Sequence, residues 1–126
     1  MHKPTLIITD DDPTVVNFLK EVAEITGYEV SAATSGKQLL EAIAETSPNV
    51  IILDMVMPDM DGIETLGKLA TRKCSSAIIL VTGFQKDYLE TANILGTAQG
   101  LNIIGSLCKP FSLDKLSELL QSAYSS

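Results

Sequence analysis

The sequence has few of the residues that build disulfide frameworks or histidine-based catalytic sites. Its 126 residues include two cysteines, one histidine and no tryptophan. Two cysteines cannot form a disulfide framework, and we expect no bridge because Cys74 lies in a polar stretch and Cys108 in an apolar one. Reduced thiols are the usual state in the cytoplasm, where we place the protein. His2 lies at the chain end, so a Ser-His-Asp arrangement is not indicated.

Basic residues are also scarce, since nine Lys and Arg residues against sixteen Asp and Glu residues give a formal net charge of −7. An acidic surface repels the phosphates of nucleic acids and of anionic lipids. We therefore expect no direct binding of nucleic acid and no attachment to a membrane. The apolar run 6–8 is too short for a signal peptide or a membrane span. Without further evidence, acidity serves only solubility.

Glycine-rich phosphate-binding motifs are missing as well. The chain has neither Gly-x-Gly-x-x-Gly nor a glycine-rich loop ending in Gly-Lys-Ser or Gly-Lys-Thr, so nucleotide binding is not indicated. The length suits one domain over residues 1–126 and excludes a (β/α)₈ barrel, which needs roughly 250 residues. With 45% hydrophobic residues, the chain can bury a core without a disulfide or a metal.

Short apolar runs alternate along the chain with segments of helical periodicity. The runs predict five strands, within residues 6–8, 28–33, 50–53, 77–81 and 101–108. A helix is expected after each strand, near residues 13–26, 36–46, 62–70, 87–95 and 113–123. Helix caps are indicated at Asp12, Gly27, Ser35, Asp61 and Ser112. This alternation predicts an α/β fold of the doubly wound (βα)₅ type, with a five-stranded parallel sheet covered on both faces.

Chemically useful side chains follow four of the expected strands. Asp10 and Asp11 end the first strand, Asp54 the third, Thr82 the fourth and Lys109 the fifth. Parallel strands end at the same edge of a sheet, where ligands bind, so we expect these side chains to meet. Clustered carboxylates repel one another, and Mg²⁺ shared with a phosphate resolves that repulsion. With an ammonium and a hydroxyl nearby, the chemistry that fits is phosphoryl transfer onto a carboxylate.

The four segments that carry these residues read ITDDDP, IILDMVMPDMDG, IILVTG and LCKPF. Together, in this order and each at a strand end, they resemble the receiver domains of two-component response regulators, over residues 5–123. The resemblance implies the flavodoxin-like fold of receiver (CheY-like) domains. It also implies a regulator that catalyses only its own phosphorylation and dephosphorylation. Its phosphodonor would be a sensor histidine kinase or a histidine phosphotransfer protein, and its downstream effector is not specified.

The resemblance assigns roles residue by residue. Asp54 accepts the phosphoryl group, and Asp11 binds Mg²⁺ directly while Asp10 acts more through water. The backbone carbonyl of Val56 is implied as a further Mg²⁺ ligand. Lys109 contacts the phosphate, and the bond that follows it, to a proline, is expected to be cis. Thr82 is implied as the hydroxyl that moves toward the phosphoryl group and draws the next loop with it.

Three features depart from the family pattern. Ser106 stands where receivers carry Tyr or Phe, and Phe84 is the nearest alternative aromatic residue. The segment 96–110 is longer than usual, which predicts a longer fourth helix or a longer loop. Val56 is hydrophobic at a place where an acid or amide often speeds loss of the phosphoryl group, so a long-lived acyl phosphate is a hypothesis.

Two other functions compete with that of a phosphoryl-accepting receiver. A receiver-like interaction module would signal without phosphate, which the complete set of acids, hydroxyl and lysine argues against. A hydrolase with an aspartyl-phosphate intermediate would show Asp-x-Asp after the first strand and a cap insertion, and this chain has neither. The remaining acids near the site, Asp12, Asp59 and Asp61, are interpreted as loop or helix-capping residues, and Met55, Met57 and Met60 as packing residues.

Overall fold

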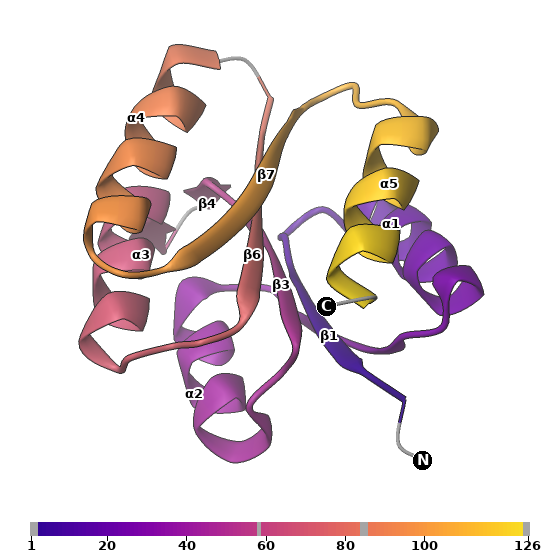
Figure 1. The fold of residues 1–126 in the computed structure, drawn as a ribbon, viewed down its shortest axis with the longest axis horizontal. Helices are drawn as coiled ribbons and strands as arrows, with labels where there is room; N and C mark the ends of the chain where they lie inside the picture. Colours follow the sequence, from indigo (N-terminus) through magenta and orange to yellow (C-terminus); the bar gives the residue numbers. More distant parts are fainter. Residues whose placement is uncertain (1–2, 58, 84–85, 125–126) are drawn as a thin grey trace.

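A computed structural model describes residues 3–57, 59–83 and 86–124 (Figure 1). Its main sheet has five parallel strands in the order β2-β1-β3-β6-β7. These strands are β1 (Thr5–Thr9), β2 (Glu29–Ala33), β3 (Val50–Asp54), β6 (Ala77–Thr82) and β7 (Asn102–Cys108). The strand order changes direction between β1 and β3, so loops from both sides of that point meet at the carboxyl ends of the strands.

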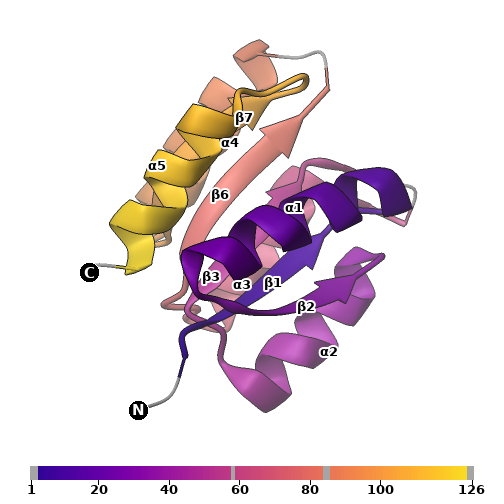
Figure 2. The same ribbon diagram turned by 90° about the vertical axis from the view of Figure 1, so that its right-hand side faces the viewer.

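Helices cover both faces of this sheet. The helices α1 (Pro13–Thr26) and α5 (Leu113–Tyr124) pack on one face, toward the viewer in Figure 2. The helices α2 (Gly36–Thr46), α3 (Gly62–Thr71) and α4 (Lys86–Ala98) pack on the other. The predicted (βα)₅ doubly wound, flavodoxin-like fold is therefore confirmed.

The central strand β3 is buried along its whole length because it lies between two layers of helices. Ile51 and Leu53 face the α2, α3 and α4 side, whereas Val50 and Ile52 face the α1 and α5 side. Each buried side chain of this size contributes roughly 1.5–3 kcal/mol relative to exposure. The unbroken apolar run in the sequence follows from this burial on both faces.

The predicted helix caps are confirmed at the elements that flank the site. The side chain of Asp12 accepts a hydrogen bond from the Thr14 N–H at 2.9 Å, and α1 begins at Pro13. Gly27 ends α1 in the left-handed conformation, with φ of 117°, which glycine adopts without steric cost. Ser35 and Asp61 cap α2 and α3 in the predicted way. These caps fix the position of Asp10, which lies between the end of β1 and the start of α1.

Three details differ from the expectations. A small antiparallel hairpin of β4 (Val56–Met57) and β5 (Met60–Asp61) follows β3, where only a loop was expected. The helix α4 reaches Ala98, beyond the predicted 87–95, and so accounts for part of the long segment before Lys109. A bulge in β7 takes up a further residue, since Ile78 pairs with Ile103 but Ile79 pairs with Gly105.

The described parts of the chain hold no disulfide between Cys74 and Cys108; both thiols are free, Cys108 exposed and Cys74 half-buried. Among the helices of residues 3–57, 59–83 and 86–124, none has both the length and the apolar character that a bilayer crossing requires.

Candidate functional site

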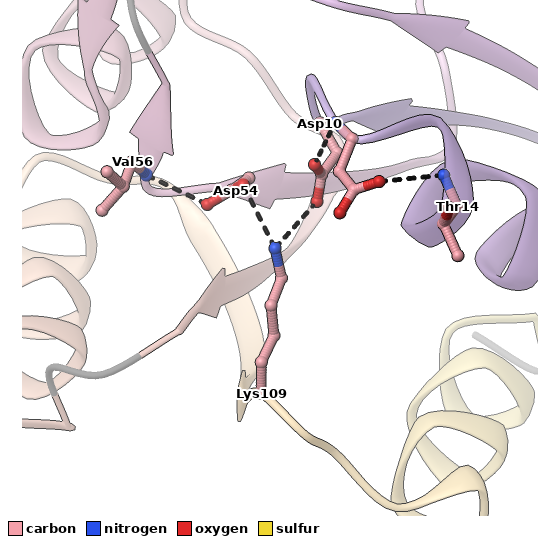
Figure 3. Close-up of polar contacts among 6 residues, drawn as sticks. Asp10, Thr14, Asp54, Val56 and Lys109 are labelled. Carbon is pink, nitrogen blue, oxygen red and sulfur yellow. Dashed lines mark hydrogen bonds and ion pairs between the residues drawn. The ribbon is translucent and has the colours of Figure 1, made fainter.

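The carboxyl edge of the sheet brings together the side chains that the sequence placed at strand ends. Asp54 is the last residue of β3, and Asp10 directly follows the neighbouring β1. Lys109 directly follows β7, and its Nζ lies 3.3 Å from Asp10 Oδ2 and 3.4 Å from Asp54 Oδ2 (Figure 3). The three charged groups come from positions that are 44 to 99 residues apart, so only the sheet topology makes them neighbours.

The acids form one cluster. One carboxylate oxygen each from Asp10, Asp11 and Asp54 lies within 4.8 Å of the others. Asp10 and Asp54 are buried, at 1% and 5% exposure, whereas Asp11 is exposed. Buried like charges at this range are costly unless a cation accompanies them. Three hard oxygen donors, one of them open to solvent, are a donor set that fits Mg²⁺.

Asp54 lies in an environment that disfavours its charged form. Burial raises the pKa of the Asp54 carboxyl above its ordinary value, and the nearby Asp10 carboxylate adds to this effect. A hydrogen bond from the Val56 N–H to Asp54 Oδ1, at 3.0 Å, and the Lys109 ammonium act in the opposite direction without cancelling the rise. A second cation at this carboxylate would therefore stabilise its ionised form.

Lys109 is held at both its backbone and its side chain. Its N–H donates to the Thr82 carbonyl at 2.7 Å, and its peptide bond to Pro110 is cis, as expected. Burial alone would lower the pKa of Lys109, but the facing carboxylates of Asp54 and Asp10 raise it above its ordinary value. The side chain is thus a permanently charged ammonium directed at the two buried acids.

Thr82 ends β6 beside this cluster. It is 1% exposed, and within residues 3–57, 59–83 and 86–124 its Oγ1 has no hydrogen-bond partner. An unpaired buried hydroxyl costs roughly 1–3 kcal/mol, so a water molecule or a ligand oxygen is expected to bind it. The hydroxyl can donate to an oxygen placed on Asp54.

These side chains line one open cavity of about 630 Å³. Its other walls come from Asp12, Gly83, Pro110 and the exposed side chain of Val56, which is 61% accessible. Every residue that the sequence proposed for the site, namely Asp10, Asp11, Asp54, Val56, Thr82 and Lys109, therefore borders the same space. The cavity is large enough for a phosphoryl group and a hydrated cation.

The acids interpreted as capping or loop residues have structural partners. Asp59 accepts hydrogen bonds from the N–H groups of Gly36 and Lys37, at 3.2 and 3.4 Å, at the start of α2. Asp61 caps α3 through the Ile63 N–H at 3.1 Å. Sequence reasoning missed a second partner of Asp61, the hydroxyl of Tyr88 in α4, which donates to its Oδ1. No local sequence pattern predicts a contact between residues that are 27 positions apart.

Ser106 lies half-buried in β7, paired with Leu80 of β6. It is on the strand face that carries Ile103, which contacts the α4 side of the core. The alternative aromatic residue, Phe84, lies outside the described residues. A replacement for the usual aromatic side chain at position 106 therefore stays a hypothesis.

Comparison with known proteins shows the family to which the chain belongs. The family model described as the response regulator receiver domain matches residues 6–121. The chain belongs to this family, in which phosphoaspartate and Mg²⁺ are typical, and it is a phosphorelay receiver. The match includes residues of all five strands of the main sheet and every residue that lines the cavity.

Individual relatives agree with the family assignment. The chain is 30% identical to the regulatory protein AtoC of Escherichia coli over 118 residues, which cover 94% of this chain and 24% of AtoC. It is 27% identical to sporulation initiation phosphotransferase F of Bacillus subtilis, over 96% of this chain and 94% of that protein. A crystal structure of a response regulator from Colwellia psychrerythraea matches with a TM-score of 0.85 and 33% identity, over 98% of both chains. The chain spans half or less of the transcriptional regulators that it matches.

Proposed function

We propose that Asp54 is the residue that accepts the phosphoryl group, from a phosphohistidine on a sensor histidine kinase or a histidine phosphotransfer protein. The observation that carries this proposal is the position of Lys109, whose ammonium lies 3.4 Å from the buried Asp54 carboxylate in a cavity shared with three further acids. A phosphoryl group on Asp54 would bring more negative charge into this cavity, and the Lys109 ammonium is already in place to offset it.

Mg²⁺ fits beside Asp54 as the second cation. Its proposed ligands are the carboxylates of Asp11 and Asp54 and the backbone carbonyl of Val56, with Asp10 acting through water. When bound, Mg²⁺ supplies positive charge that offsets the clustered carboxylates and the oxygens of the phosphoryl group. A cation beside Asp54 would offset the burial and the Asp10 charge that disfavour its ionised form, which is the form that acts as the nucleophile.

In the proposed transfer, a carboxylate oxygen of Asp54 forms a bond to phosphorus as the bond from phosphorus to the donor imidazole nitrogen breaks. The electron pair of that bond stays on the imidazole. Lys109 stabilises the phosphoryl oxygens as an electrostatic partner, and Thr82 donates a hydrogen bond to one of them. The chain thereby catalyses its own phosphorylation and dephosphorylation and acts on no separate substrate.

The output is a shift between two conformations. The Thr82 hydroxyl favours the state in which it reaches the phosphoryl group, and the helix α4 shifts with it. A downstream effector or an output domain recognises this change. We propose that the receiver domain covers residues 1–126 and works in the cytoplasm. Direct binding of nucleic acid is not proposed, given the net charge of −7. The alternative of a phosphate-independent interaction module is not favoured, because the full set of site residues is present.

The direct test is incubation with acetyl phosphate and Mg²⁺, followed by intact-mass measurement. Wild-type protein should gain the mass of one phosphoryl group, and addition of a chelator should prevent this gain. Asp54→Asn should gain nothing, whereas Asp114→Asn, which makes the same change in the first turn of α5, should behave as wild type. Mg²⁺-dependent labelling of Asp54→Asn at the wild-type level would overturn the assignment.

A further inference from the structure

The Tyr88 hydroxyl joins the hairpin after Asp54 to the helix α4. Tyr88, in the first turn of α4, donates its hydroxyl hydrogen to Asp61 Oδ1. The same oxygen accepts from the Ile63 N–H at 3.1 Å, so Asp61 caps α3 and binds Tyr88 at once. Burial, and then the hydrogen bond to Asp61, raise the pKa of the Tyr88 hydroxyl to about 12, against the opposing effect of hydrogen bonds with the backbone of Ile63 and Gly62.

Asp61 is connected to Val56 through the hairpin. Val56 of β4 and Asp61 of β5 are directly paired in the antiparallel ladder. The next residue, Gly62, donates its N–H to the Met55 carbonyl at 3.0 Å. It lies so close that a Cβ atom added to it would be 2.7 Å from Met55 Cα. The two residues that follow Asp54 are therefore held against residues 61 and 62. A displacement of Asp61 would be transmitted to them through the pairing of β4 with β5.

We propose that Tyr88 is a positioning residue for the metal site: by holding Asp61, it fixes the hairpin whose other strand presents the Val56 carbonyl. This inference rests on the proposed function, because Val56 is a ligand only if Mg²⁺ binds beside Asp54. Ordering a ligand before binding removes part of the entropy that binding would otherwise cost. Groups that orient metal ligands from outside the coordination sphere change metal affinity by roughly 10- to 100-fold when they are removed.

The test compares Mg²⁺ binding to wild type, Tyr88→Phe and Tyr124→Phe by titration calorimetry. Tyr88→Phe deletes only the hydroxyl and should raise the Kd for Mg²⁺ by about 3- to 10-fold, below the range for groups that touch a ligand directly. Tyr124→Phe, which makes the same change in the last turn of α5, should leave the Kd unchanged. A Kd for Tyr88→Phe within twofold of wild type overturns the inference.

A double-mutant cycle tests whether Tyr88 acts through Asp61. Asp61→Ser keeps a side chain that caps α3 but is too short to hold Tyr88. Adding Tyr88→Phe to Asp61→Ser should change the Mg²⁺ affinity by less than twofold. Independent, multiplying effects would contradict the proposed route through Asp61.

The labelling reaction separates positioning from general damage to the fold. For Tyr88→Phe, the Mg²⁺ concentration that gives half-maximal labelling by acetyl phosphate should rise by the same factor as the Kd, and saturating Mg²⁺ should restore the wild-type rate. A rate that stays low at saturating Mg²⁺ would contradict a role through Val56. If wild-type protein binds no Mg²⁺ and is not labelled, the proposed function itself fails. A wild-type response combined with an unchanged Tyr88→Phe removes the inference alone.

Discussion

The Lys109 ammonium donates a hydrogen bond to Asp54 across the end of the sheet, with Nζ 3.4 Å from Oδ2. Asp54 ends β3 and Lys109 directly follows β7, and these two strands are not adjacent, since β6 lies between them. Lys109 also reaches Asp10, at 3.3 Å, so one cation serves two buried carboxylates. This shortage of positive charge is the basis of the first two predictions.

Replacement of Lys109 by Met should lower the stability of the metal-free protein and strengthen its response to Mg²⁺. Removing the ammonium leaves two buried carboxylates without their cation, and we expect a loss of about 1–3 kcal/mol, moderated because part of the lysine side chain is exposed. Mg²⁺ binding should tighten, because a competing positive charge is gone. Urea denaturation with and without Mg²⁺ measures both effects. Lys115→Met, at an exposed site on α5, is the control, and equal behaviour of the two variants would contradict the role of Lys109 as the cation of both carboxylates.

Replacement of Asp54 by Asn should stabilise the metal-free protein at pH 7. The pKa of Asp54 is raised above its ordinary value of 3.8, so the folded protein binds this proton more readily than the unfolded chain. Wild-type stability therefore falls as the pH rises from 3.8 through the raised pKa, and the cost of the ionised carboxylate is fully present above it. Denaturation curves at several pH values should show an advantage for Asn that disappears below pH 3.8. An advantage that does not change with pH would contradict burial as its cause.

Two glycines of α3 should respond in opposite ways to the same substitution. Gly62→Ala places a Cβ 2.7 Å from backbone atoms of Met55, which neither segment can avoid, and should cost about 2 kcal/mol or more. It should also slow labelling of Asp54, since Met55 is the adjacent residue. Gly67→Ala meets no atom within 4 Å and should stabilise the helix by roughly 0.5–1 kcal/mol. Thermal unfolding of both variants is the measurement, and shifts in the same direction would argue against the close contact at Gly62.

Much of this architecture could be predicted because it depends on local patterns. The run of apolar residues in β3 reflects burial on two faces, and Asp12 with Pro13 marks the start of α1 through its own capping hydrogen bond. The site residues at strand ends could also be named, since parallel strands place their carboxyl ends on one edge. Asp54 and Lys109 met as expected once the order of the strands followed the doubly wound pattern.

The features that could not be predicted depend on contacts between distant segments. The strands β4 and β5 have two residues each, too few for a periodic pattern. The hydrogen bond between Tyr88 and Asp61 needs α4 to lie beside α3, and the bulge at Ile104 exists only relative to the register of β6. Gly105 lies next to this bulge, where an added Cβ would be 2.6 Å from the side chain of Leu119, and such packing is decided by the assembled fold.

The exposed side chain of Val56 predicts a slowly decaying acyl phosphate. Val56 borders the same cavity as Asp54 and is 61% accessible, but it has no polar atom that could orient an attacking water molecule. Val56→Asn should therefore lose the phosphoryl group faster than wild type, whereas Val56→Leu should not. The decay of purified phosphorylated protein, followed by intact mass, gives the three rates. Equal rates for wild type and Val56→Asn would refute the hypothesis.

Among the three clustered carboxylates, we propose that Asp54 carries the phosphoryl group. Borohydride reduces an acyl phosphate to an alcohol and so marks the carboxyl group that held it. Wild-type protein would be phosphorylated with acetyl phosphate and Mg²⁺, reduced, digested and mapped by tandem mass spectrometry. Homoserine is expected at position 54 and unmodified aspartate at positions 10 and 11. Reduction at Asp10 or Asp11, with Asp54 intact, would contradict it.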